Sequence, residues 1–503
     1  MPLFFKHPWL LIASLAGSLM LSVWMIFIDS VINNDGVHYL MTAEFLSRGD
    51  WQSAVQTFKW PAYPFLIYLA QVLPGVDFEL AAHVVTTLGF TITVLCFVAI
   101  CRQLFNTRAM PWIALVVVLC YPGINEFRAF IIRDSVFLAL YMGSIWFLVH
   151  YTMAQRWWPL IGSAMLMALA ALFRVEALVL LAMYPLLIIG RVASGHWRWL
   201  LVLLYLVIGV EFLSTFYGWW MYRPQGQLDP WALLQRPGDL AGQAWIQWRE
   251  GFVDQVASHD SGNLLLALLV TVGSVIGMVL YASVETMTLP FTIILICALV
   301  QPRLLAPVPR PILRKLALVL IILVGVLLAF AATRFFVAPR YAMALCMTLL
   351  LLVPIVLHQL WFDLLPKLKP LPRQVIRVLL VMLLIINALE GLDRFTIKQY
   401  LKEAGTWLKH NTRPGDRVIS NSTQFAYYAD RHRETWVLVP DYDEFIEFLE
   451  SGQWLYKDYV AVSLRRRDQE LAQIVAQTLD QEPIREYINS KGDRLLIFYT
   501  ADD

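Results

Sequence analysis

The sequence predicts a mainly α-helical, polytopic membrane protein: a bundle of about eleven to thirteen transmembrane helices followed by a small α/β domain. Three observations lead to this class. Of the 503 residues, 59% are hydrophobic and only 15% are charged, and the mean hydropathy is +0.61, values typical of a membrane protein. Apolar stretches of spanning length recur up to about residue 392. Beyond that point the composition becomes that of a soluble domain.

Charge and cysteine content narrow the function classes. A formal net charge of +2 and the lack of a basic run give no reason to expect a nucleic-acid partner. The five cysteines lie in or beside apolar segments, without a CxxC pair or a metal-ligand spacing, which indicates packing residues. The residues indicate no cofactor and no metal site, and dependence on a divalent metal stays open.

The apolar stretches define the expected spans. The first is interpreted as an uncleaved span, because it is longer than the apolar part of a signal peptide and no cleavage site ends it. Residues 263–300 must cross an odd number of times yet hold apolar length for two spans, so we expect one full span and a bent or re-entrant piece near Glu285 and Pro290. The stretches lie at 8–28, 78–101, 109–122, 134–151, 157–173, 176–190, 199–217, 263–283, 286–300, 316–333, 341–360 and 377–391.

Lysine and arginine residues in the connecting segments predict the orientation, since cytoplasmic loops carry the excess. Basic clusters near residues 102–108, 191–198, 303–315 and 367–377 place the N-terminus in the cytoplasm. The other polar segments then gather on the outer face: a first outer loop at 29–77, a large outer loop at 218–262 and the C-terminal domain. We therefore predict two domains, residues 1–392 in the membrane and residues 393–503 outside it.

The first outer loop contains the most distinctive stretch of the chain. It reads DGVHYLMTAEFLSRGDW from Asp35 to Trp51 and continues to a Lys59-Trp60-Pro61 turn. Its apolar residues, among them Tyr39 and Leu46, form one stripe of a short helix, the pattern of a helix lying flat on a membrane.

Ionisable groups at membrane depth are expensive and therefore indicate function. Beyond Asp35 and Lys59, they occur on the outer side in three stretches, containing Arg128, Arg133 and Asp134, then Arg174 and Glu176, then Arg334, Arg340 and Tyr341. The surplus of cations beside a membrane favours a lipid phosphate or pyrophosphate as the ligand, because arginine binds phosphate oxygens in a bidentate way. Internal ion pairs, Arg133 with Asp134 and Arg174 with Glu176, are the alternative.

Two further regions have less specific patterns. The tryptophan-rich loop at 218–262, which contains His259, predicts either a gate over the site or an interfacial amphipathic helix. In the C-terminal region, helix-like runs at 397–410, 423–429, 442–451 and 467–479 alternate with strand-like runs at 417–420, 435–439, 459–463 and 495–499. This alternation predicts a small α/β domain, with a role in docking or folding support.

The stretch after the first span resembles a known family. The pattern DGxxYxxxAxxLxxGDW, followed by a Lys-Trp-Pro turn, is similar to the first outer loop of GT-C-fold glycosyltransferases of the bacterial protein-mannosyltransferase and lipid A aminoarabinose-transferase type. The segments FRAFIIRDSVFLALY, LFRVEALVLL and APRYAMALCMTLLLLVP also resemble that family, so the likeness covers nearly the whole chain. Two departures stand out: Trp60 separates Lys59 from Pro61, and Gly36 stands where many members carry a second acidic residue.

The resemblance implies an inverting glycosyltransferase of the GT-C fold. Such an enzyme moves a single sugar from a polyprenyl-phosphate donor, such as undecaprenyl phosphate, to an acceptor hydroxyl at the periplasmic face of a bacterial inner membrane. The acceptor stays open among lipid A or lipopolysaccharide glycan, another envelope polymer and protein. Membrane lipids are the other expected partners.

The resemblance also implies roles for individual residues. Asp35 is the expected catalytic base. The donor phosphate is expected to meet Lys59, Arg133, Arg174 and Arg340. Supporting positions are Asp134, Glu176, Tyr39, Tyr63, Tyr341 and His259, with the three tyrosines equally interpretable as interfacial anchors.

Two other classes fit parts of the pattern. An O-antigen polymerase or ligase would also set outer arginines against a lipid pyrophosphate, but it concentrates its polar residues in a large late loop, whereas here the sharpest pattern lies early. A transporter or flippase would place charges in mid-span and show internal repeats, and the sequence shows neither.

Overall fold

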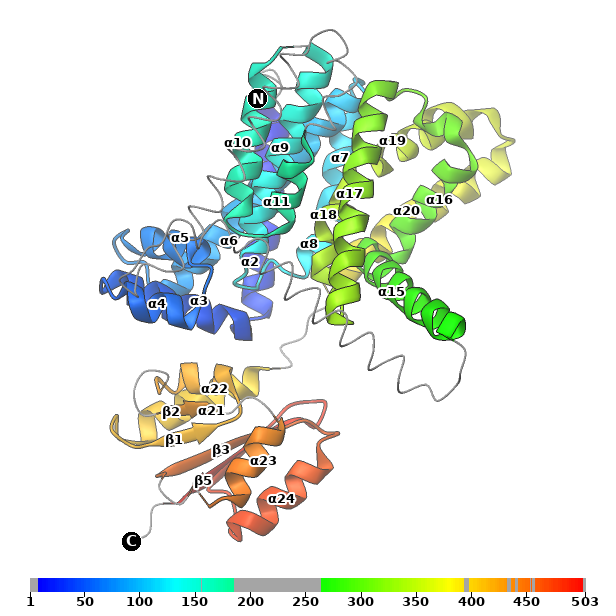
Figure 1. The fold of residues 1–503 in the computed structure, drawn as a ribbon. Helices are drawn as coiled ribbons and strands as arrows, with labels where there is room; N and C mark the ends of the chain where they lie inside the picture. The colour runs from blue at the N-terminus through cyan, green and yellow to red at the C-terminus, as the bar shows by residue number, and fades with distance from the viewer. Residues whose placement is uncertain are drawn as a thin grey trace.

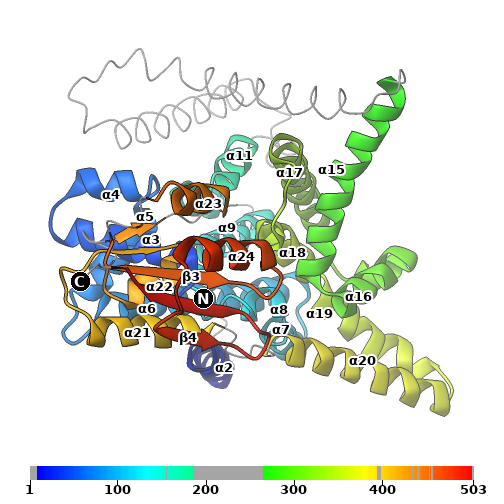
Figure 2. The same cartoon turned by 90° about the horizontal axis from the view of Figure 1, so that it is seen from below.

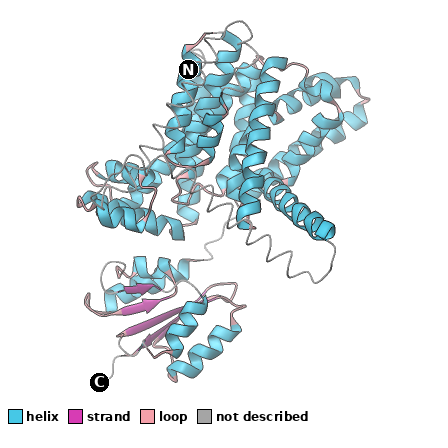
Figure 3. Cartoon of the chain, viewed as in Figure 1, coloured by secondary structure: helices cyan, strands magenta, loops and turns pink. Residues whose placement is uncertain are grey.

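The computed structural model describes residues 8–154, 156–184, 264–392, 398–431, 436–438, 442–452, 454 and 457–500. Helices make up the membrane part, and a small sheet with its own helices forms the C-terminal part (Figures 1 and 3). The predicted span at 199–217, the large loop at 218–262 and His259 lie outside the described residues.

The helices of the membrane part follow the predicted apolar stretches. Among the described residues, six helices are long and apolar enough to cross a membrane, or seven if one bent pair counts as a single span. Shorter apolar helices complete the bundle. In chain order the helices are α2 (Pro8–Ile28), α6 (Phe78–Leu104), α7 (Met110–Leu119), α8 (Pro122–Asn125), α9 (Asp134–Ala154), α10 (Trp158–Ala171), α11 (Glu176–Ala182), α15 (Leu264–Met287), α16 (Leu289–Val300), α17 (Arg310–Arg334), α18 (Met343–Leu350), α19 (Val353–His358) and α20 (Pro370–Glu390).

A sharp bend separates α15 from α16, in the region where a bent piece was expected. The chain direction changes by 107° between the two helices. Thr288, at the bend, has φ of 67°, a left-handed conformation that is costly for a β-branched residue. Its hydroxyl donates to Asn387 Oδ1 at 2.6 Å, so α20 holds the bend in place.

Close backbone approach packs the bundle. A Cβ atom added at Gly89 of α6 would lie 2.7 Å from the carbonyl carbon of Ser135 in α9, the kind of contact that small residues permit between membrane helices. Arg128, which the sequence grouped with Arg133, is instead fully buried against α2, where it donates to Ser18 and Ser22. Arg128 thereby ties α2 to the bundle.

The segment predicted as the first outer loop folds as α3 (Asn34–Ser47), α4 (Trp51–Thr57) and α5 (Ala62–Gln71). The apolar stripe of α3 does not face a membrane. Tyr39, Ala43 and Leu46 are buried, and α3 packs against α4, α5 and α6. The periodicity predicted an amphipathic helix correctly, but it cannot distinguish a lipid surface from a protein surface.

The C-terminal part is a five-stranded sheet of order β2-β1-β3-β5-β4. Strands β2 (Trp436–Leu438), β1 (Val418–Ser420) and β3 (Tyr459–Leu464) pair in parallel. Strand β5 (Arg494–Tyr499) pairs antiparallel with β3 and with the edge strand β4 (Arg485–Ile488). Helices α21 (Gln399–Asn411) and α22 (Thr423–Tyr428) cover one face, and α23 (Tyr442–Glu450) and α24 (Gln469–Leu479) the other (Figure 2). The predicted α/β character is confirmed; β4, an edge strand whose side chains are mostly exposed, was not predicted.

Candidate active site

Asp35 occupies the first turn of α3, where the helix dipole favours a negative charge. Its carboxylate accepts a hydrogen bond from Arg340, with 2.6 Å between Oδ2 and Nη1. The Asp35 side chain is 42% exposed and that of Arg340 31%. Asp35 is therefore held by an ion pair but remains open to a ligand.

Arg340 reaches Asp35 because of a chain reversal after α17. Phe335 ends that helix in a left-handed conformation with φ of 48°. A 3₁₀ turn then begins at Pro339 (Pro339–Ala342), and the Pro339 carbonyl accepts a hydrogen bond from Thr286 at 2.7 Å. The turn and its anchor hold Arg340 at the start of the next helical segment.

Arg174 lies deeper, between two carboxylates. It forms ion pairs with Asp134, at the start of α9, and with Glu176, at the start of α11, and its side chain is only 7% exposed. Its guanidinium also stacks over Phe137 at 5.7 Å and Tyr341 at 5.0 Å. The Arg174–Glu176 ion pair that the sequence left open is present, and Asp134 is paired with Arg174.

Tyr341 lies between two guanidinium groups. Arg340 approaches the Tyr341 ring at 5.5 Å and Arg174 at 5.0 Å. Asp134, Arg174, Glu176, Arg340 and Tyr341 all border one small cavity together with Phe137 and apolar residues of α17 and α18. The ring thus connects the exposed Asp35–Arg340 pair to the buried ion-pair group.

Arg133 lies against the Lys59-Trp60-Pro61 turn. Its guanidinium lies 5.7 Å from the centres of the Phe58 and Trp60 rings. Lys59 beside them is exposed. Trp60 therefore has Arg133 over its ring and Lys59 as its neighbour in the chain.

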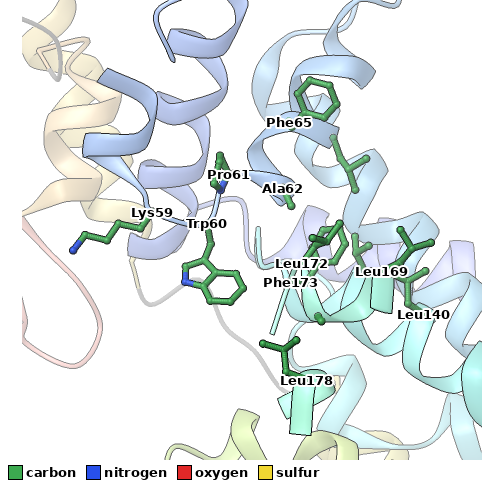
Figure 4. A pocket seen from close by; sticks show the side chains of 13 residues that line it. Lys59, Trp60, Pro61, Ala62, Phe65, Leu140, Leu169, Leu172, Phe173 and Leu178 are labelled. Carbon is green, nitrogen blue, oxygen red and sulfur yellow. The ribbon is translucent and has the colours of Figure 1, made fainter. Parts of the chain in front are cut away.

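A cavity of about 460 Å³ opens beside this turn (Figure 4). Apart from Lys59, its lining is almost entirely apolar, and the Lys59 side chain points away from the other lining residues. The lining comprises Lys59, Trp60, Pro61, Ala62, Phe65, Leu66, Val136, Leu140, Leu169, Ala171, Leu172, Phe173 and Leu178.

Tyr39 of α3 and Tyr63 of α5 pack against each other. Their ring centres lie 5.0 Å apart, and the Tyr63 hydroxyl shares a hydrogen bond of 2.7 Å with Thr86. Burial raises the pKa of Tyr39 well above its usual value, so this hydroxyl stays protonated. Both side chains are buried in protein, so neither is an interfacial anchor.

Metal ligands do not gather at the site. Within the described ranges, no group of three or more His, Cys, Asp or Glu side chains could hold a metal ion. The residues that meet there are carboxylates paired with guanidinium groups, an arrangement suited to anion binding and proton transfer.

Sequence separation explains which contacts were missed. Arg340 and Asp35 lie 305 positions apart, so their pairing could not be read from spacing. Lys402, Gln424 and Tyr428 of the C-terminal part hydrogen-bond the backbone just before Asp35, and no local pattern marks them as site residues.

This chain, a helical membrane bundle with a polar site at one end and a small α/β sheet after the last helix, has the GT-C fold. It is similar to ArnT from Cupriavidus metallidurans bound to undecaprenyl phosphate, with a TM-score of 0.54 and 15% identity over 98% of this chain and 99% of that one. The apo state of that ArnT gives a TM-score of 0.53 at 15% identity, with 98% of each chain covered.

An oligosaccharyltransferase from Archaeoglobus fulgidus, tethered to an acceptor peptide, is also similar, with a TM-score of 0.54 and 13% identity over 99% of this chain and 75% of that one. No protein-family model matches the sequence, and no curated protein matches it. The chain is therefore similar to these solved structures in fold.

Proposed function

We propose that this protein is an inverting glycosyltransferase that moves a single sugar from a polyprenyl-phosphate donor to an acceptor hydroxyl. The observation that carries the proposal is the half-exposed Asp35 carboxylate, held by Arg340 at one end of the membrane bundle. The GT-C fold, shared with an ArnT bound to undecaprenyl phosphate, supports a lipid-linked donor.

The donor is proposed to bind beside the Lys59-Trp60-Pro61 turn. The apolar cavity there suits the first units of an isoprenoid chain. Lys59, next to Trp60 in the chain, and Arg133, over the Trp60 ring, are proposed to meet the phosphate, together with Arg340. Cations directed at the leaving phosphate stabilise the charge that grows as its bond to the sugar breaks.

Asp35 is proposed as the general base. Its carboxylate takes the proton of the acceptor hydroxyl while that oxygen forms a bond to the anomeric carbon. The bond from the anomeric carbon to the phosphate oxygen breaks, and the electron pair leaves with the polyprenyl phosphate. Because attack and departure occur on opposite faces, the configuration at the anomeric carbon inverts.

Arg174 takes a supporting part in this proposal. Asp134 and Glu176 already neutralise its charge, so it holds the Tyr341 ring, against which Arg340 lies. Tyr63 of α5 supports α3 by packing against Tyr39 of that helix. The site faces the periplasm of a bacterial inner membrane in this proposal, and the acceptor is an envelope glycan, a lipid such as lipid A, or a protein.

The test uses the full chain in nanodiscs with undecaprenyl-phosphate monosaccharides and envelope acceptors. Wild type should consume one donor in the presence of an acceptor, and Asp35→Asn should lower turnover by about 10²–10⁴-fold while still binding that donor. Asp50→Asn is the matched control: Asp50 is an exposed helix cap in the same outer loop, and asparagine caps equally well.

Near-normal turnover by Asp35→Asn would contradict the assignment of the base. Turnover of pyrophosphate-linked glycans but of no monosaccharide donor would instead identify a polymerase or ligase.

A further inference from the structure

The segment that leads into α3 is short and buried. We call Ser30 to Asn33 the lead-in segment; it joins the end of α2 to the start of α3, two residues before Asp35. Val31 and Ile32 are buried. Buried backbone groups need hydrogen-bond partners. The lead-in segment lies between two helices, so the side chains that bond its backbone show what holds it in place.

Those partners come from the C-terminal α/β part. The Gln424 amide donates to the Ile32 carbonyl at 2.5 Å, and the Ile32 N–H donates to the Tyr428 hydroxyl at 3.0 Å. The Tyr428 hydroxyl donates in turn to the Ser30 carbonyl at 3.3 Å, and Lys402 Nζ donates to the same carbonyl at 3.0 Å. Both backbone polar groups of Ile32 are thus satisfied by side chains of α22.

The Tyr428 hydroxyl is suited to this double role. It accepts from one backbone group and donates to another, which requires the neutral phenol. Burial raises the pKa of Tyr428 well above its usual value, and Lys402 lies over its ring at 5.0 Å. A phenylalanine would keep the ring packing and lose both hydrogen bonds.

The membrane part also holds the lead-in segment, through Asn33 and Ile131. The Ile131 N–H donates to Asn33 Oδ1 at 2.9 Å, and Asn33 Nδ2 donates to the Ile131 carbonyl at 3.3 Å. Ile131 lies two residues before Arg133. Asn33 therefore sets Asp35 in register with the segment that carries one of the proposed phosphate ligands.

We propose that Gln424 and Tyr428 are positioning residues for Asp35. By holding the lead-in segment against Asn33 and Ile131, α22 fixes the first turn of α3 and so the place of the Asp35 carboxylate opposite Arg340. The C-terminal part then contributes to the active site through these hydrogen bonds to the lead-in segment. The catalytic consequence rests on the proposed function, whereas the clamp on the lead-in segment does not.

The first measurement is hydrogen exchange of the full chain in nanodiscs, followed by mass spectrometry. Tyr428→Phe, Gln424→Leu and the double variant should speed exchange of amides in residues 30–36. Tyr499→Phe is the matched control, because it removes a phenol hydroxyl from an exposed position of β5 in the same part of the chain. Unchanged exchange within β3 shows that the sheet is intact. If Gln424→Leu disturbs the sheet, Tyr428→Phe alone tests the same prediction with a smaller change.

The second measurement is turnover of a polyprenyl-phosphate sugar by the same proteins. Misplacing a catalytic group by about 1 Å costs on the order of a hundredfold, so kcat of the double variant should fall by about ten- to a hundredfold. KM for the donor should stay within about threefold of wild type, since the donor contacts are intact.

Each outcome decides one part. Unchanged exchange in residues 30–36 of the double variant would refute the clamp. Faster exchange with wild-type kcat would refute positioning while leaving the proposed function standing. If wild type turns over no donor, the proposed function and the catalytic consequence fall together, and the exchange result still decides the clamp.

Discussion

Arg174 shows how a single residue can be costly to bury and costly to remove. The sequence singled it out as a phosphate ligand, and the structure surrounds it with Asp134, Glu176 and two aromatic rings. Burying these charges is expensive, but removing one partner is worse, because uncompensated charge remains inside the protein.

Replacing Arg174 with glutamine should therefore destabilise the protein by about 3–5 kcal/mol. Thermal unfolding in detergent, followed by intrinsic fluorescence, measures the change in free energy of unfolding. Arg48→Gln is the control: Arg48 approaches Glu44 at 3.9 Å and is 51% exposed, so its loss should cost under about 1 kcal/mol. Equal destabilisation by both variants would contradict the buried ion-pair group as a source of stability.

At the scale of elements, the close approach of α3 to the segment before α9 determines where Asp35 lies. A Cβ atom at Gly36 would meet Ile32 Cγ2 at 2.7 Å, Asn33 Oδ1 at 2.9 Å and Ile131 Cβ at 3.0 Å. Any larger side chain here would force Ile32, Asn33 or Ile131 to shift. Glycine here is a packing requirement of α3.

Gly36→Ala should therefore destabilise the protein by about 1–3 kcal/mol, the usual cost of overpacking. Gly273→Ala in α15 should have the opposite sign, since no atom lies within 4 Å of an added Cβ there and alanine favours a helix by about 1 kcal/mol. Melting temperatures of the two variants in the same detergent test this. A stabilising Gly36→Ala would show that α3 is free to shift away from Ile131.

The two ends of the chain lie at opposite ends of the molecule (Figure 1). The described N-terminal helix α2 starts at one end of the bundle, and the α/β part lies beyond the other (Figure 1). The lead-in segment, at the end of α2, is hydrogen-bonded to the α/β part, and α3 packs against α22. Asp35 lies at this junction, so the proposed active site and the C-terminal part share one side of the membrane.

Cysteine labelling in intact cells tests that orientation. With the native cysteines replaced, Gly415→Cys in the α/β part, where an added Cβ meets no atom within 4 Å, should react with a membrane-impermeant maleimide. Lys367→Cys, at an exposed position in the predicted cytoplasmic segment before α20, should react only after permeabilisation. The reverse pattern would invert the proposed topology and move the site to the cytoplasm.

Local sequence patterns predicted much of the fold. Apolar length predicted the long helices, and the surplus of apolar length in residues 263–300 predicted the bend that the structure has at Thr288. The edge strand β4 was missed because its exposed side chains (Arg485, Glu486, Ile488) lack the alternation of a half-buried strand.

By itself the sequence determined that this is a helical membrane protein with an α/β part at its end, because hydrophobic length and periodicity are local properties that each segment carries alone. It also marked Asp35, Arg174 and Arg340, because a charge beside a membrane span is conspicuous. Only the tertiary structure decided the distant partners: Arg340 for Asp35, Asp134 for Arg174, and α22 for the lead-in segment. These contacts join residues tens to hundreds of positions apart, and which pair forms depends on how the packed helices bring them together.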